Sequence, residues 1–215
     1  MQKTSIIPLI VLSGLVAMTL PAYADSSVTY GQPTALYTTS TTDYGGGDGS
    51  GSSISSLGPF SFSSSLVEDS VTGSWSTWNS PPAVESGTPN VLYGNGAQSL
   101  TLTLSGSSNT AGFELEPDSF QTDDVTASFY DGVTLIDTIE LSPNGNSGAL
   151  LFALSDTTPG ASISSIVITD NSSDDFAIAQ LRAGTVNPVP EPGTLSLLGL
   201  GILGLAKRAY RKVKA

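Results

Sequence analysis

Short stretches in which apolar and polar residues alternate set the strongest limit on how this chain can fold. In the stretch SLTLTLS, Leu100, Leu102 and Leu104 alternate with serine and threonine, which is the period of two expected of a half-buried β-strand. The stretch DVTASFY, over residues 124–130, alternates in the same way. It is followed by Asp131-Gly132 and a second apolar run, a strong signal for a two-residue β-hairpin. The alternation predicts antiparallel strands joined by tight turns.

Further short apolar runs occupy residues 149–155, 162–169 and 176–183. Clusters of Ser, Asn, Asp, Gly and Pro separate them, as turns would. No stretch between them carries the pattern of a long amphipathic helix. We therefore expect an all-β domain over residues 61–186, built as an antiparallel β-sandwich or jelly roll.

Composition excludes several classes of function. The 215 residues contain no cysteine and no histidine, so disulfides, thiol chemistry and the commonest general base are absent. From Asp25 to Arg182 there are 18 acidic residues and one basic residue. Such a surface repels nucleic acid and anionic lipid, because it has no cations to neutralise phosphates. It favours solubility and neutral or cationic partners, divalent cations among them.

The N-terminal residues 1–24 have the order of a secretory signal peptide. Lys3 precedes an apolar run, and Ala22 and Ala24 occupy the −3 and −1 positions of a cleavage site. We expect cleavage before Asp25 and export of the chain. A retained N-terminal anchor is the alternative, although the apolar run is short for one.

Residues 25–60 have little periodic apolar character and are rich in Ser, Thr and Gly. They predict a flexible segment or a long loop. The stretch contains GGGDGSG, over residues 45–51, which is similar to one imperfect copy of a calcium-binding repeat loop. A plain linker is the alternative interpretation.

Two carboxylates are the candidates for catalysis. Glu114 and Glu116 alternate with apolar residues in FELEP, so they project from one face of a strand. Such a pair could flank a glycosidic bond, but the solvent-facing side of an amphipathic strand gives the same alternation. Trp75 and Trp78 could stack on sugar rings. On a strand they would point to opposite faces, so at least one is expected to be buried.

Acidic turns are the candidates for metal binding. Asp170, Asp174 and Asp175 lie in a loop before the last predicted strand, and Asp123 and Asp124 lie in another loop. Oxygen-rich loops can hold calcium, whereas ordinary turn chemistry also places Asp in such loops. We expect no cofactor other than a possible structural calcium ion at Asp170, Asp174 and Asp175.

The C-terminal residues 187–215 combine a proline-rich break, an apolar run and a basic cluster. The run, Gly193–Ala206, has about fourteen residues, which is short against the ~20 of a usual spanning helix. It predicts a single transmembrane helix with its basic end in the cytoplasm. The basic residues after it are Lys207, Arg208, Arg211, Lys212 and Lys214.

This tail closely resembles the PEP-CTERM sorting signal. Val189 precedes the tripeptide Pro190, Glu191 and Pro192, and a short span and a basic cluster follow. The resemblance implies recognition by an exosortase, cleavage near the motif and transient residence in the inner membrane. It also implies a Gram-negative source that makes extracellular polysaccharide.

The segment AGFELEP…DFAIAQLRAG resembles an ectodomain that recurs in exported bacterial proteins with this tail. The features of this chain that carry the resemblance are a strand opened by GFE-E and a last strand beginning DFAI. The resemblance covers about residues 90–184 and implies a fold similar to galactose-binding-like jelly rolls. It implies no active residues.

Together these features predict an exported, non-enzymatic protein of the cell surface or exopolysaccharide matrix. Its expected role is structural or carbohydrate-binding, and its expected partners are an exosortase-type enzyme and extracellular polysaccharide. Two alternatives stay open. One is a polysaccharide-active glycoside hydrolase that uses Glu114 and Glu116, and the other is a calcium-stiffened adhesin.

Overall fold

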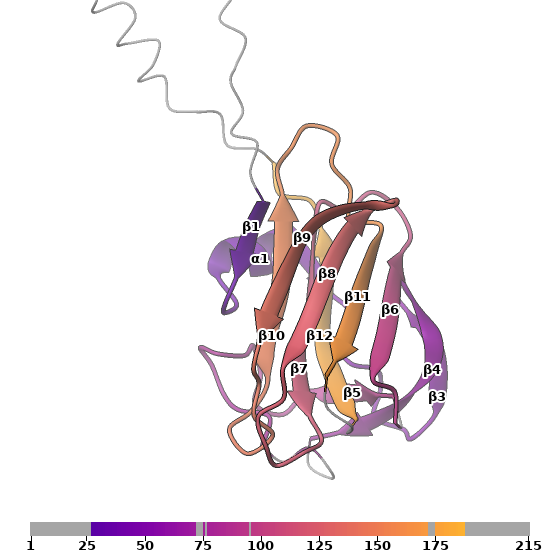
Figure 1. Ribbon diagram of the computed structural model, residues 1–215, viewed down its shortest axis with the longest axis vertical. Helices are drawn as coiled ribbons and strands as arrows, with labels where there is room; N and C mark the ends of the chain where they lie inside the picture. The colour runs from indigo at the N-terminus through magenta and orange to yellow at the C-terminus, as the bar shows by residue number, and fades with distance from the viewer. Residues whose placement is uncertain (1–26, 72–74, 76, 95, 172–174, 188–215) are drawn as a thin grey trace, which may run out of the picture. The chain divides into compact units, whose positions relative to one another are not determined.

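The alternating segments form the strands of an antiparallel sheet that curls into two packed layers (Figure 1). The computed structural model describes residues 27–71, 75, 77–94, 96–171 and 175–187. Its elements are β1 (Ser27–Tyr30), α1 (Ala35–Ser40), β2 (Thr41–Asp43), β3 (Ser53–Leu57), β4 (Phe60–Ser70), β5 (Asn90–Tyr93), β6 (Ser99–Leu104), β7 (Thr110–Pro117), β8 (Val125–Asp131), β9 (Thr134–Leu141), β10 (Leu150–Asp156), β11 (Ser165–Asp170) and β12 (Phe176–Gly184).

Neighbouring strands follow the order β1-β10-β7-β12-β5-β4-β6-β11-β8-β9, and every named strand pair is antiparallel. β2 adds to β12, and β3 adds to β4. The sheet is nearly closed, because β9 at one end contacts β1 and β10 at the other. The Ser27 hydroxyl donates to Asp137 Oδ2 across this seam, at 3.2 Å. The arrangement confirms the prediction of an all-β antiparallel fold and agrees with a jelly-roll-like sandwich.

The main core lies between the two layers. In β6, Leu100, Leu102 and Leu104 are buried and face the core, as their alternation predicted. Phe113 of β7 and Phe152 of β10 stack in this core with ring centroids 5.5 Å apart. Burial of these apolar side chains is the main stabilising contribution to the fold.

The predicted hairpin at Asp131-Gly132 is confirmed. β8 ends at Asp131 and β9 begins at Thr134. Gly132 has a φ of +58°, a left-handed conformation that glycine adopts without steric cost. Its backbone N–H donates to the Ser164 hydroxyl at 2.8 Å, so the turn is also tied to the start of β11.

In place of the flexible segment expected over residues 25–60, the structure has β1, α1, β2 and β3. The helix begins after Thr34, whose hydroxyl accepts from the Tyr37 N–H at 3.2 Å, as an N-cap does. Tyr30 and Tyr37 then pack on Leu151 and Ala153 of β10. The Ser- and Thr-rich strands add to edges of an existing sheet, so main-chain hydrogen bonds form them without an apolar pattern of their own.

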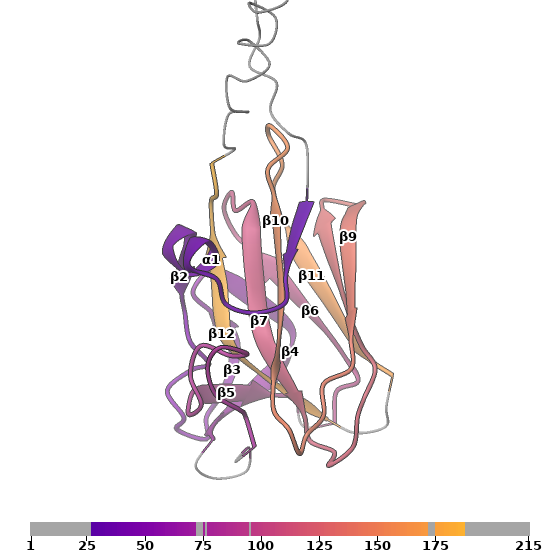
Figure 2. The ribbon, with the colours of Figure 1, turned by 90° about the vertical axis from the view of Figure 1, so that its left-hand side faces the viewer.

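Figure 2 shows that α1 and β2 lie on one side of the layer formed by β7, β10 and β12, while β6, β9 and β11 lie on the other. This layer is therefore covered on both faces. The described residues all fall within the unit Tyr23–Val189.

Candidate functional site

The layer of β10, β7 and β12 has a second buried face, opposite the main core. The apolar residues of β7 point into the main core, so Glu114 and Glu116, which alternate with them, project from the other face. The residues between β4 and β5, described at 75 and 77–89, lie over this face and are called the covering segment here. Apolar side chains of this segment and of the strands form a small cluster here, which consists of Val71, Trp75, Trp78, Val84, Val91, Ala149, Ala177 and Ala179.

Glu114 is held by two donors from the covering segment. The Trp78 indole N–H donates to Oε2 at 3.1 Å, and the Glu85 backbone N–H donates to Oε1 at 2.6 Å. Burial raises the pKa of Glu114 to about 7, while both hydrogen bonds act to lower it. The carboxyl is therefore partly protonated near neutral pH.

Glu116 is linked to the covering segment through Thr77. The Thr77 hydroxyl lies within hydrogen-bonding distance of both Glu116 Oε1 and the Gly145 carbonyl oxygen. A hydroxyl has only one proton to donate. A protonated Glu116 Oε1 that donates to Thr77, which in turn donates to Gly145, gives each of these three oxygens a partner, while Glu116 Oε2 has none among the described residues. Burial raises the pKa of Glu116 to about 7, in agreement with this arrangement.

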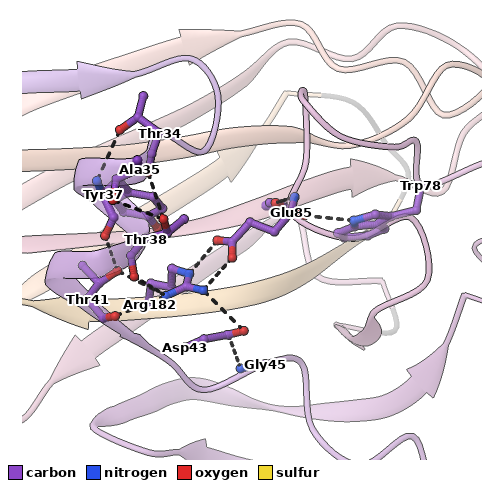
Figure 3. A network of polar contacts seen from close by, with 11 residues as sticks. Thr34, Ala35, Tyr37, Thr38, Thr41, Asp43, Gly45, Trp78, Glu85 and Arg182 are labelled. Carbon is purple, nitrogen blue, oxygen red and sulfur yellow. Dashed lines mark hydrogen bonds and ion pairs between the residues drawn. The ribbon is translucent and has the colours of Figure 1, made fainter.

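Glu85, whose backbone N–H donates to Glu114, forms a buried ion pair with Arg182 (Figure 3). Arg182 of β12 donates from Nε to Glu85 Oε1 and from Nη2 to Glu85 Oε2, both at 2.6 Å. Its Nη1 donates to the carbonyl oxygens of Thr38 and Thr41, and Asp43 Oδ2 lies 3.7 Å from Nη2. Burial acts to lower the pKa of Arg182, but the hydrogen bonds and charge of Glu85 outweigh it and raise that pKa.

Tyr37 of α1 lies next to this ion pair. Its side chain is fully buried, and its hydroxyl has no hydrogen-bond partner among the described residues. Burial, with the charge of Glu85 second, raises the pKa of this hydroxyl well above its usual value. A Cβ on Gly112 of β7 would lie 2.6 Å from the hydroxyl oxygen. Glycine at this position therefore lets the tyrosine lie against the strand.

The burial of this cluster limits its chemistry. Glu114 is 0% exposed and Glu116 is 1% exposed. Two catalytic carboxyls must both reach the bond between bound sugars, and in this structure the covering segment separates them from solvent. The cluster joins the covering segment, α1 and β12 through hydrogen bonds and one ion pair.

The structure corrects the two sequence interpretations of this region. Glu114 and Glu116 do share one face of a strand, but that face does not point to solvent, because the covering segment lies over it. Trp75 and Trp78 are both buried, and neither lies on a strand. Trp78 donates to Glu114 and Trp75 packs near Tyr93, so the two rings do not form an exposed sugar-stacking surface.

Sequence reasoning missed Tyr37, Glu85 and Arg182. One signal was available, because Arg182 is the only basic residue among 18 acidic ones between Asp25 and itself. A lone arginine at an inward position of a strand requires a buried acceptor. The identity of that acceptor depends on a contact between residues 97 positions apart, which no local pattern shows.

The GGGDGSG loop encloses an acidic side chain of β4. The Asp48 N–H donates to Glu68 Oε1 at 3.0 Å, and the Ser50 hydroxyl donates to Oε2 at 3.1 Å. Gly47 has a φ of +84°, and a Cβ there would lie 2.3 Å from Glu68 Oε1. The glycines thus allow the loop to close around Glu68.

The predicted calcium ligands are only partly described. Asp170 ends β11 and is buried, and Asp175 Oδ2 accepts from the Gly96 N–H at 2.9 Å. Asp174 lies outside the described residues. In the part of the chain that the structure describes, no three acidic side chains gather in a way that could hold a metal ion. Calcium at this loop stays a prediction.

Other predicted sites lie outside the described residues. No helix in the described ranges is long and apolar enough to cross a membrane. The predictions concerned are the signal peptide of residues 1–24 with Ala22, Ala24 and Asp25 at its cleavage site, the sorting motif of Val189, Pro190, Glu191 and Pro192, the transmembrane helix, and the basic cluster of Lys207, Arg208, Arg211, Lys212 and Lys214.

Comparisons with solved structures give only distant similarity. The enzymatically active domain of bacteriophage CBA120 tailspike protein 4 aligns with a TM-score of 0.34 and 14% identity, over 66% of this chain and 21% of the tailspike chain. This chain thus spans about a fifth of that protein. A mutant of a family 29 carbohydrate-binding module aligns with a TM-score of 0.31 and 12% identity, over 76% of this chain and 99% of the module. None of the curated proteins matches the sequence.

The described residues define an all-β protein with a jelly-roll-like domain. The hydrogen bonds and the ion pair of its buried polar cluster join parts of that domain to one another. The chain also carries a PEP-CTERM protein-sorting motif, which the family comparison detects at residues 188–212. This motif indicates an exported precursor that transits the membrane and is processed by an exosortase-type enzyme.

Proposed function

We propose that this chain is a non-enzymatic protein of the cell surface or exopolysaccharide matrix, with a structural or carbohydrate-binding role. The sorting motif supports delivery to that location. The domain surface supports a neutral partner, since Arg182 is the one basic residue between Asp25 and the end of β12 and is itself buried in an ion pair.

The observation that carries the proposal is the burial of Glu114 and Glu116. They are the candidates for hydrolysis, and hydrogen bonds to the covering segment occupy both oxygens of Glu114 and Oε1 of Glu116, while Glu116 Oε2 is buried. A general acid with a raised pKa suits glycoside hydrolysis, but it must also contact the glycosidic oxygen.

The test is an assay of the full-length protein on the exopolysaccharide of the producing cells. Pull-down measures binding, and release of reducing ends measures hydrolysis. We expect binding without release of reducing ends, and no change in either quantity on Glu116→Gln substitution. Hydrolysis that disappears with Glu114→Gln or Glu116→Gln would establish the enzyme instead. Absence of binding, together with an unchanged biofilm after gene deletion, would remove the proposed role.

Processing is tested separately in cells. We expect a Glu191→Ala variant, with the tripeptide of the sorting motif broken, to accumulate as the longer membrane-bound precursor. The wild-type chain should appear as a shorter form at the surface or in the medium. Equal processing of the two chains would show that the motif is not used.

A further inference from the structure

The loop between β7 and β8 carries an exposed aromatic ring. Phe120 in this loop is 73% exposed. The other large apolar side chains that stand exposed in the described ranges are aliphatic: Val28, Leu36, Val133 and Leu135. A phenylalanine held in water keeps a large apolar surface that a ligand could cover.

The loop that carries Phe120 is firmly held by the loop between β9 and β10. The Asn146 amide donates to the Phe120 carbonyl oxygen at 2.7 Å, and the Gly145 N–H donates to the Gln121 carbonyl oxygen at 3.2 Å. Packing is close, because a Cβ on Gly145 would lie 1.8 Å from the Ser119 carbonyl oxygen. Because the backbone on either side of Phe120 is already held in this way, binding a ligand there costs little backbone entropy.

Amides and hydroxyls surround the ring on the two loops. Gln121, Thr122, Asn146 and Ser147 are all exposed. An apolar ring face beside hydrogen-bonding groups matches a sugar, which presents a C–H face and a rim of hydroxyls. A protein-binding surface would instead be expected to group several large apolar or Arg side chains around the ring.

The negative charge of the loop disfavours anionic ligands. Asp118 and Asp124 are exposed in the same loop, and Arg182, the one basic residue of the described ranges, is paired with Glu85. Anionic polysaccharide and anionic lipid would both meet repulsion with no compensating cation. A neutral sugar chain carries no charge and is not repelled.

Phe120 lies beyond the end of β7 that is away from Gly184, where β12 ends. β7 and β12 are antiparallel, with Pro117 opposite Phe176 and Thr110 opposite Gly184. Phe120 follows Pro117, whereas the chain continues from Gly184 toward the sorting motif. The eight residues of β7 separate the two ends by about 25 Å, at roughly 3.3 Å a residue.

We propose that Phe120 and the exposed amides of Gln121 and Asn146 form a binding site for neutral polysaccharide. This inference rests on the proposed carbohydrate-binding function and names its ligand class and its place. The ring stacks on one sugar face, and the amides hydrogen-bond to the adjacent hydroxyls.

The experiment uses the full-length protein in mild detergent and affinity electrophoresis in gels that contain a soluble β-glucan, a galactomannan or alginate. We expect retardation by one or both neutral polymers and none by alginate. Phe120→Ala should weaken binding about tenfold, the range in which aromatic contacts contribute. Phe120→Trp should retain binding, and its fluorescence emission should shift when the bound polymer is added. Val133→Ala, which shortens an exposed apolar side chain at the β8–β9 turn, is the matched control.

Each outcome decides between the two proposals. If the wild-type protein binds a neutral polymer and Phe120→Ala binds equally well, the site is wrong while the carbohydrate-binding function survives. If only alginate retards the protein, the neutral ligand class is wrong. If none of the polymers retards it, the carbohydrate-binding role and the site fall together. An unchanged melting temperature in Phe120→Ala shows that loss of binding is not loss of folding.

Discussion

Arg182 and Glu85 form a bidentate ion pair that joins the last strand of the sheet to the segment covering it. Both N–O distances are 2.6 Å, and the two residues are 97 positions apart in the chain. The pair lies on the face of β12 opposite the main core, next to Glu114. It explains how a segment without regular secondary structure is held on a sheet.

Removing one member of this pair should be costly, because the other is left buried without a partner. We expect Glu85→Ala or Arg182→Ala to lower the free energy of unfolding by about 3 kcal/mol. Urea denaturation measures the change. In the double substitution Glu85→Met with Arg182→Met the loss should be much smaller, since no unpaired charge remains. If the single and double variants lost equal free energy of unfolding, the stabilisation would come from side-chain packing and not from the ion pair.

Stability should fall as pH rises from about 4.5 to about 7. Glu114 and Glu116 have ordinary pKa values of 4.5, and burial raises each to about 7 in the folded chain. The folded state therefore binds more protons than the unfolded state within this window. By linkage, the free energy of unfolding decreases with pH there and levels off above about 7.

Urea denaturation at a series of pH values measures this slope. The variant with Glu114→Gln and Glu116→Gln should be nearly flat between the two limits, since it has no carboxyl to ionise at either site. Glu140→Gln, which removes an exposed carboxyl on β9, should keep the wild-type slope. A slope that persists in the double variant would assign the pH dependence to other groups.

Trp78→Phe should destabilise the domain by about 2–3 kcal/mol, because it removes the donor to Glu114 and leaves a small cavity. Loss of that hydrogen bond should also raise the pKa of Glu114 further, which moves the pH window upward. Trp75→Phe is the control, since it removes the same atoms from the same apolar cluster but no bond to a carboxyl. The two variants should differ in pH profile as well as in stability.

Tyr37→Phe should leave stability unchanged or increase it by up to about 1 kcal/mol. Its buried hydroxyl gains no hydrogen bond from the described residues to offset its lost hydration. Tyr30→Phe should instead cost about 1 kcal/mol, because its hydroxyl shares a 3.0 Å hydrogen bond with Ser155. Thermal unfolding of the two variants gives the comparison, and a loss with Tyr37→Phe equal to that with Tyr30→Phe would contradict it.

The sequence was sufficient to predict the strands whose apolar residues face the main core. Leu100, Leu102 and Leu104 alternate because one side of β6 is buried and the other is not. The same reasoning failed for β1 and β2, where edge pairing with β10 and β12 stabilises strands of low hydrophobicity. Main-chain hydrogen bonds between distant segments leave no local pattern.

The candidate site was only half predictable. Alternation correctly placed Glu114 and Glu116 on one face of β7, but it could not show whether another segment covers that face. The cover depends on contacts such as Trp78 with Glu114 and Thr77 with Glu116. Trp78 and Thr77 do not lie in a sequence pattern with the period of a strand or a helix. The pattern therefore gave no reason to expect a segment over this face of the sheet.

The near closure of the sheet has a consequence for aggregation. The four-residue β1 and the eight-residue β9 end the strand order, and they lie against each other across the Ser27–Asp137 hydrogen bond. Open edge strands are the usual starting points for aggregation, because their free peptide groups pair with a second chain. At this seam the two end strands therefore leave less of each edge open to pairing with a second copy, whereas β2 and β3 each pair on one side only within the described residues.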